Sequence, residues 1–291
     1  MNEFVQGSPT TLSRLPPYNG AMPELADLWR FEPIPIALTF VALLFYTLGT
    51  GPLRPRFFPR QSYPATKAAL FYLSMAVLTL VFVSPLHTLG EFYLLSAHMA
   101  TMMIVIFVVA PLFLLGIPGW LVAPLALHPL IKPVLRFMTR PIVNVVHFNL
   151  AFLVIHLPFV LQPLMFSTDA LHYYTYFAIF GSAVLMWWPL MNPLPGDLPN
   201  PAYKTQMLYL LVLITAHNPF SSVFSFYPGV IYPWYQEVPR VFNLGVLQDQ
   251  QLAGVIMGTI YITTMLIALA AVFVRWFSEG ETRGKALPVS T

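Results

Sequence analysis

Long uninterrupted apolar runs constrain the fold of this chain more than any other feature of its 291 residues. There are seven, and most approach or exceed the roughly 18 to 20 residues that a helix needs to cross a bilayer. Membrane barrel strands would instead alternate apolar and polar residues. Hydrophobic residues make up 57% of the chain and charged residues 9%, which is too few to cover a water-soluble surface. We therefore predict an all-α polytopic integral membrane protein with seven transmembrane helices.

Connections rich in proline and glycine separate the apolar runs, because these residues end helices. The predicted helices span about residues 34–48, 66–83, 92–115, 142–165, 171–190, 203–226 and 250–277. The corresponding division of the chain is an extracytoplasmic N-terminal tail (1–31), a seven-helix membrane domain (32–278) and a cytoplasmic C-terminal tail (279–291). The tail before residue 34 has no apolar core of the signal-peptide kind.

Basic side chains are unevenly divided among the predicted connections. The first, third and fifth connections and the C-terminal tail carry Arg54, Arg56, Arg60, Lys67, Lys132, Arg136, Arg140, Lys204, Arg283 and Lys285. The second and fourth carry no Lys or Arg, and the sixth carries only Arg240. Because cytoplasmic loops are enriched in Lys and Arg, this asymmetry predicts an N-terminus outside and a C-terminus in the cytoplasm.

Composition also excludes several kinds of function. The chain has no cysteine, so disulfides and thiolate metal sites are excluded. Its net charge of +3 is not arranged as the basic stripe with stacking aromatics that binds nucleic acid. No nucleophile–base pair, phosphate-binding loop or pair of carboxylates lies within a predicted span. We therefore expect neither enzyme activity nor nucleic-acid binding.

Several histidines fall inside the predicted spans, where ionisable groups are costly and are functional candidates. At 1.5 Å of rise per residue, four of them lie in the outer half of the membrane: His98, His156, His172 and His217. Asp249 opens the last helix at the same face. His87 is assigned to an outer loop, whereas His128 and His147 lie toward the cytoplasmic side and are expected to be structural.

An outward-facing pocket of histidine and methionine would select copper among the common metals. Met102 follows His98 by four residues and therefore shares its helix face. Imidazole and thioether ligands together suit Cu(I). Each residue also has a structural alternative. His98 could form a packing hydrogen bond, and His156 and His217 precede prolines whose missing donors leave carbonyls for them to bind.

The last predicted helix carries Gly254 and Gly258 four residues apart, a small-residue face that lets another helix approach closely. This face either packs against another helix of the same chain or docks a partner membrane protein. Both interpretations remain open at the level of sequence.

Several segments, in this order, resemble one family. They are Ser84-Pro85-Leu86, Ser96-Ala97-His98-Met99, Ala110-Pro111-Leu112, Leu115-Gly116-Ile117-Pro118, His156-Leu157-Pro158, Leu171-His172, Trp187-Trp188-Pro189, Tyr232-Pro233-Trp234-Tyr235 and Asp249-Gln250-Gln251-Leu252-Ala253-Gly254. Over about residues 70–277 the chain resembles the CtaG-like membrane-integral assembly factors of cytochrome c oxidase. The resemblance implies seven helices in a bacterial inner membrane, partners among the haem–copper oxidase subunits, and copper delivery. It implies functional positions at His98, Met99, His172 and Asp249.

Two positions depart from the family pattern, in which a second histidine follows the first by four residues in the third and fifth helices. Here these positions are Met102, which can bind Cu(I), and Tyr176, a poor Cu(I) ligand. The expected function is therefore an oxidase assembly factor that handles copper, with a permanent accessory subunit of a respiratory complex as the alternative. Haem ligation by two histidines is a third alternative. The candidate copper ligands are His98, Met99, Met102, His156, His172, His217 and Asp249.

Overall fold

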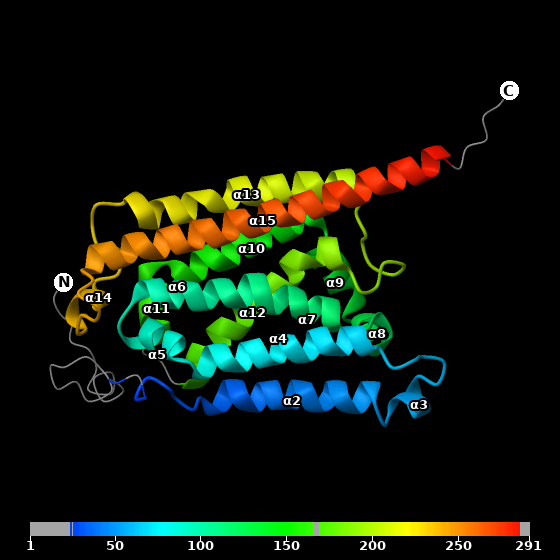
Figure 1. Cartoon of the computed structure of the whole chain (residues 1–291), viewed down its shortest axis with the longest axis horizontal. Coiled ribbons are helices and arrows are strands. Elements are labelled where there is room, and N and C mark those ends of the chain that lie inside the picture. The colour runs from blue at the N-terminus through cyan, green and yellow to red at the C-terminus, as the bar shows by residue number, and fades with distance from the viewer. Residues whose placement is uncertain (1–23, 25, 166–168, 286–291) are drawn as a thin grey trace.

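Helices make up the architecture throughout the part of the chain that the structure describes (Figure 1). The computed structural model describes residues 24, 26–165 and 169–285, and no side chains at 162, 165, 169–172 and 280–285. In order the helices are α2 (Pro33–Thr50), α3 (Arg54–Phe57), α4 (Ala65–Val83), α5 (Pro85–Phe92), α6 (Leu95–Ile104), the π-helix η1 (Val105–Val109), α7 (Ala110–Gly116), α8 (Gly119–Ala126), α9 (Lys132–Met138), α10 (Pro141–His156), α11 (Pro158–Met165), α12 (Asp169–Met191), α13 (Tyr203–Phe226), α14 (Trp234–Glu237) and α15 (Val246–Lys285).

Five of these helical segments are long and apolar enough to cross a membrane. They are α2, α4, the continuous helix Leu95–Gly116 formed by α6, η1 and α7, then α13 and the Val246–Glu279 part of α15. A sixth results if α9 and α10, which meet at 82°, form one broken span. The predicted multi-pass helical protein is therefore confirmed, whereas the count of seven spans is not. The remaining long helix is α12, with 23 residues.

Proline decides where several helices begin and end. It occupies one of the first two positions of α2, α5, α9 and α10, where its missing N–H has no intrahelical partner to lose. The predicted helix 142–165 is wrong for the same reason. Leu157, which precedes Pro158, is extended, so α10 ends at His156 and α11 starts at Pro158.

The predicted helix 92–115 also differs from the structure. It begins at Leu95 because Leu94 is extended, and it contains the π-helix η1 just before Pro111. A proline removes one backbone donor from the helix, and a π-turn is one way to re-pair the neighbouring carbonyls. The indole N–H of Trp187 donates to the carbonyl of Ile106 at 2.9 Å, and the Ser74 hydroxyl donates to the carbonyl of Val109 at 2.9 Å. Side chains from α12 and α4 therefore supply partners for this irregular turn.

Small residues let α15 lie against α13, its neighbour in Figure 1. A Cβ atom at Gly254 would lie 2.6 Å from the backbone nitrogen of Ser225 and 2.8 Å from the carbonyl oxygen of Ser221. One at Gly258 would lie 3.1 Å from the Ser221 hydroxyl. The two glycines therefore serve contact within the chain, which is the first of the two alternatives that their spacing allowed.

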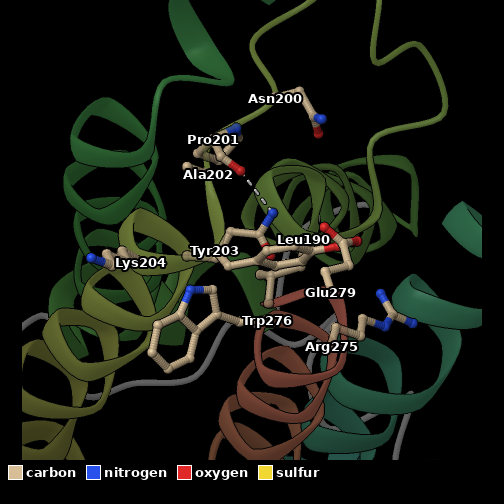
Figure 2. A pocket seen from close by; sticks show the side chains of 10 residues that line it. Leu190, Asn200, Pro201, Ala202, Tyr203, Lys204, Arg275, Trp276 and Glu279 are labelled. Atoms are coloured by element: carbon tan, nitrogen blue, oxygen red, sulfur yellow. Dashed lines mark hydrogen bonds between the residues drawn. The ribbon is translucent and has the colours of Figure 1, made fainter. Parts of the chain in front are cut away.

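The bundle has two chemically different ends, which we call the α5 end and the α3 end after short helices that lie there (Figure 1). The α3 end has a cavity of about 640 Å³ lined by Tyr203, Lys204, Arg275 and Trp276 among others (Figure 2). The Lys204 ammonium lies 6.0 Å from the centre of the Trp276 ring. Cations and a tryptophan together are typical of a membrane–water interface. His98, near the start of α6, and His156, at the end of α10, lie away from this cavity and nearer the α5 end (Figure 1).

Candidate metal-handling site

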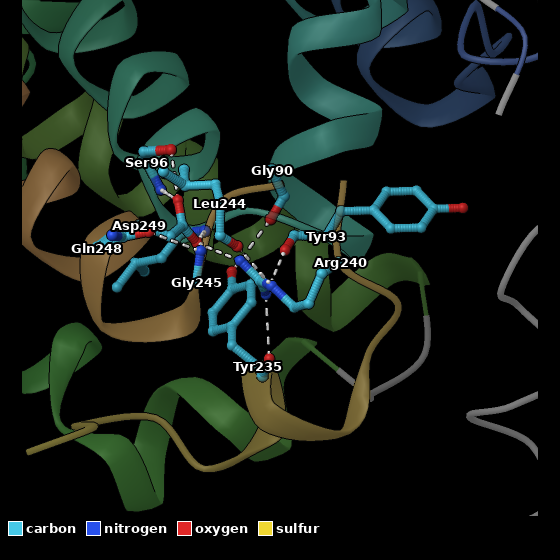
Figure 3. Close-up of polar contacts among 10 residues, drawn as sticks. Gly90, Tyr93, Ser96, Tyr235, Arg240, Leu244, Gly245, Gln248 and Asp249 are labelled. Atoms are coloured by element: carbon cyan, nitrogen blue, oxygen red, sulfur yellow. Dashed lines mark hydrogen bonds and ion pairs between the residues drawn. The ribbon is translucent and has the colours of Figure 1, made fainter. Parts of the chain in front are cut away.

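His98 lies one turn into α6, at 2% exposure, and Asp249 at the start of α15 holds that turn (Figure 3). The two oxygens of the Asp249 carboxylate accept hydrogen bonds from the backbone N–H of Leu95 (2.8 Å) and of Ser96 (3.1 Å), and the Ser96 hydroxyl donates at 2.5 Å. A carboxylate at a helix N-terminus satisfies unpaired donors and interacts favourably with the helix dipole. Asp249 was predicted as a metal ligand; in the structure both its oxygens cap the helix that carries His98.

Arg240 completes this network (Figure 3). Its guanidinium lies 3.6 Å from the Asp249 carboxylate and donates to the carbonyls of Tyr93 (3.2 Å) and Tyr235 (3.1 Å). Burial, with a smaller contribution from the Asp249 charge, raises the pKa of Tyr235, so its hydroxyl stays protonated and donates to the Gly90 carbonyl at 3.2 Å. The α5–α6 connection, the α14 turn and the start of α15 are thereby joined around one ion pair.

The rings of His98 and His156, from two different helices, meet edge-on at an interplanar angle of 66°. Their centroids are 6.3 Å apart, with His98 on α6 and His156 at the last position of α10. Both side chains are buried. A metal ion bound at about 2 Å from a nitrogen of each ring can bridge a separation of this size. The structure therefore brings together two of the predicted ligands, which are 58 positions apart in the sequence.

His156 is oriented so that a single ring nitrogen is left for a ligand. Its Nδ1 lies 2.7 Å from the carbonyl oxygen of Phe152, and a carbonyl can only accept, so Nδ1 carries the proton. Nε2 then holds the lone pair, and it is buried with no hydrogen-bond partner among the described residues. The Tyr232 hydroxyl also donates to the His156 carbonyl at 2.7 Å, at the point where α10 ends. Metal-binding histidines are commonly held in this way, with one N–H on a backbone carbonyl.

His217 is surrounded by aromatic rings, one of which is Phe152. Phe152 stacks on His156 with centroids 4.0 Å apart and meets His217 edge-on at 4.7 Å. His217 also stacks on Tyr261, with ring centroids 4.4 Å apart. His217 is 1% exposed, and neither of its ring nitrogens has a hydrogen-bond partner among the described residues. The three histidines form a row, which we call the histidine row (His98, His156 and His217), with Phe152 between the last two.

The remaining predicted ligands lie on α6 and α12. Met102 and Met99 are fully buried on α6, and Met102 is one turn along from His98 on the same helix face, whereas the adjacent Met99 points elsewhere. His172 falls in α12, but its side chain lies outside the described residues. Tyr176, also on α12, contacts the row directly: its hydroxyl lies 3.3 Å from Nδ1 of His98.

One group of ligand-type side chains was not predicted from the sequence. Glu32, His87 and Glu91 lie together at the α5 end, with one potential ligand atom of each within 4.8 Å of the others. His87 was expected in a loop; it lies in α5, because Pro85 starts a helix there, and it is 1% exposed. The i, i+4 spacing of His87 and Glu91 is the signal that could have indicated a shared face. We call these three residues the Glu–His–Glu cluster.

The histidine row offers soft and borderline donors to a metal ion. Two imidazoles on separate helices, with a thioether on the same face as one of them, match the preference of Cu(I). Apolar and aromatic side chains surround the rings, which would keep water and harder ligands away. This arrangement suits holding a soft ion more than activating a nucleophile.

Comparisons with known proteins identify the family of the chain. Searches of curated proteins and of solved structures found no match to the chain. The sequence profile of one family, described as cytochrome c oxidase caa3 assembly factor (Caa3_CtaG), matches residues 44–279. That range extends from α2 to α15 and includes His98, His156, His217 and Asp249. The chain therefore belongs to the Caa3_CtaG family of cytochrome c oxidase assembly factors.

Proposed function

We propose that this protein handles copper for an oxidase from within the bacterial cytoplasmic membrane, holding Cu(I) in transit at His98 and His156, with Met102 as the third donor. Family membership supports the assembly role and the oxidase as partner. The orientation of His156 carries the copper assignment. Its Nδ1 proton is committed to the Phe152 carbonyl, and its Nε2 is buried near a second imidazole from another helix. Copper is here the cargo and not a resident cofactor.

Neutral donors suit a protein that must release its ion. Two neutral imidazoles and a thioether bind Cu(I) without a carboxylate or thiolate, which would hold the ion more firmly by charge. Asp249 is not part of this ligand set, because hydrogen bonds from the α6 N-terminus occupy its oxygens. It acts as a positioning residue by fixing the turn on which His98 lies.

Replacing His98 and His156 together with alanine is expected to abolish Cu(I) binding, whereas the wild type retains about one Cu(I) per chain. The measurement is Cu(I) competition against a coloured chelator, using protein purified in detergent. His147→Ala is the matched control, since His147 lies on the same helix as His156 but its Nδ1 faces the Ser182 hydroxyl at 3.4 Å. A wild type that retains no Cu(I) would refute the assignment and favour a permanent accessory subunit. A double variant that binds Cu(I) normally would refute His98 and His156 as the ligands.

Topology has a separate test, because the chain has no native cysteine and any introduced thiol is the single one present. Basic residues gather in the segments expected to be cytoplasmic, and Arg60 is exposed on one of them. A Gln236→Cys variant, exposed at the α5 end, should react with a membrane-impermeant thiol reagent in intact cells. An Arg60→Cys variant should react only after lysis. The reversed pattern would place the α5 end in the cytoplasm.

A further inference from the structure

The Glu–His–Glu cluster joins three separate parts of the chain at the α5 end. His87 and Glu91 lie one turn apart on α5, with Nε2 of His87 3.8 Å from the Glu91 carboxylate. Glu32 is the residue immediately before α2, and its backbone is extended. Its carboxylate lies beside the His87 and Glu91 atoms that could bind a metal. Tyr173 on α12 donates its hydroxyl to Glu32. The carboxylates and the imidazole therefore converge from the start of α2 and from α5, and α12 contributes the Tyr173 hydroxyl.

Burying two carboxylates and an imidazole together costs free energy unless their charge is balanced. Glu32 and Glu91 are each 9% exposed and His87 is 1% exposed. Aromatic rings enclose His87, with Phe82 at 5.1 Å and Tyr176 at 5.5 Å between centroids. Two carboxylates this close repel each other when both are ionised, and desolvation strengthens the repulsion. A divalent cation with two glutamates and a neutral imidazole would bring the cluster to zero net charge.

The donor set selects the class of ion. Calcium prefers six to eight oxygen ligands and magnesium keeps most of its water, so neither suits a site with an imidazole and two carboxylates. Cu(I) prefers soft ligands, which this cluster lacks. Imidazole with carboxylate is a ligand combination of Zn²⁺ and of other first-row divalent ions. We propose that Glu32, His87 and Glu91 bind one first-row divalent transition-metal ion, such as Zn²⁺, at a site separate from the histidine row.

The spacing of the ligand atoms is compatible with this ion. Ligands about 2.1 Å from a tetrahedral metal lie about 3.4 Å from one another. The three atoms of the cluster are within 4.8 Å of one another, so rotation of the two flexible glutamate side chains completes the contact. Tyr173 orients Glu32 as a hydrogen-bonding partner of the kind that ligating carboxylates usually have. The bound ion would link the start of α2 to α5.

Tyr176 contacts both this site and the histidine row. Its ring lies 5.5 Å from His87, and its hydroxyl lies 3.3 Å from Nδ1 of His98. The two proposed sites have different ligands at different positions. Those of the histidine row favour Cu(I), and those of the Glu–His–Glu cluster favour a divalent ion. Loss of one is not expected to remove the other.

Zn²⁺ titration of the full-length protein in lipid nanodiscs tests the proposal. Wild type, stripped with a chelator, should bind one Zn²⁺ at this site and show a higher melting temperature with Zn²⁺ than without. Glu91→Gln keeps the shape of the side chain but removes its charge, and should weaken this binding by at least about 100-fold. Tyr173→Phe removes the hydroxyl that donates to Glu32 and should weaken binding by about tenfold.

Two controls separate this result from the copper proposal. Glu237→Gln neutralises an exposed glutamate near the same end and should bind Zn²⁺ as the wild type does. The His98→Ala, His156→Ala double variant should lose Cu(I) but keep Zn²⁺. X-ray absorption of the Zn²⁺ form should show about one imidazole among oxygen ligands. A wild type that binds no Zn²⁺, or Zn²⁺ binding that Glu91→Gln leaves unchanged, would overturn the proposal even if Cu(I) binding holds.

Discussion

Replacing Asp249 with alanine is expected to lower the melting temperature of the purified protein more than any other single loss of a carboxylate. The change removes three hydrogen bonds to Leu95 and Ser96 at the start of α6, a helix cap worth about 1–2 kcal/mol. It also leaves Arg240 without its ion-pair partner. Removing one partner of a buried pair costs about 3–5 kcal/mol, and Arg240, at 25% side-chain exposure, recovers part of this from water. A total of about 2–4 kcal/mol is expected.

Two further variants test the cause of this loss. Asp249→Asn keeps one acceptor for the helix N-terminus and should fall between the wild type and Asp249→Ala. Glu237→Ala removes an exposed carboxylate near the same end and should leave the melting temperature unchanged. Because Asp249 positions His98 and does not bind metal in the proposal, Asp249→Asn protein that remains folded should still bind Cu(I). Complete loss of Cu(I) from folded Asp249→Asn protein would instead favour Asp249 as a ligand.

Gly90→Ala is expected to produce the second large effect, by separating α5 from α6. A Cβ atom at residue 90 would lie 2.6 Å from the backbone nitrogen of His98, 2.7 Å from its Cα and 2.9 Å from the carbonyl carbon of Ala97. These are backbone atoms and cannot rotate away, so one helix must move. Overpacking of this kind costs about 1–3 kcal/mol or more. The displacement would act on both proposed sites, because His98 belongs to one and α5 carries two ligands of the other.

Gly181→Ala is the matched control for this substitution. Gly181 lies inside α12, and a Cβ atom there would have no neighbour within 4 Å. Alanine is favoured over glycine in a helix by about 0.8–1.0 kcal/mol, so Gly181→Ala should be neutral or stabilising. The measurement is thermal unfolding in detergent together with Zn²⁺ and Cu(I) binding. If Gly90→Ala behaved like Gly181→Ala, the close contact between α5 and α6 would be refuted.

Prolines explain where prediction from the sequence succeeded and failed at the level of helices. Apolar length identified the positions of α2, α4 and α13 to within a few residues. Pro158 follows an apolar run that continues without interruption, so composition alone did not show that α10 ends at His156. The same residue type placed His87 in a helix, because Pro85 is a favourable first residue. Local backbone chemistry, and not hydropathy, decided both cases.

The residues of the proposed copper site were accessible to sequence reasoning because depth along a helix follows from counting residues. Counting residues placed His98, His156 and His217 toward the same face of the membrane, and which face this is stays a prediction. The distance between His98 and His156 was not accessible, since the rotation of each helix about its axis depends on packing with its neighbours. For that reason the insertion of Phe152 between His156 and His217 could not be foreseen either.

Sequence by itself therefore determined that this chain is a multi-pass helical membrane protein with basic connections and candidate metal ligands at defined depths. Tertiary structure decided what those ligands contact. Asp249 meets the start of a helix 153 positions earlier, and Glu32 meets α5 and α12. The reason is physical: apolar length and charge are properties of a segment, whereas a binding site depends on the directions in which side chains from distant segments point.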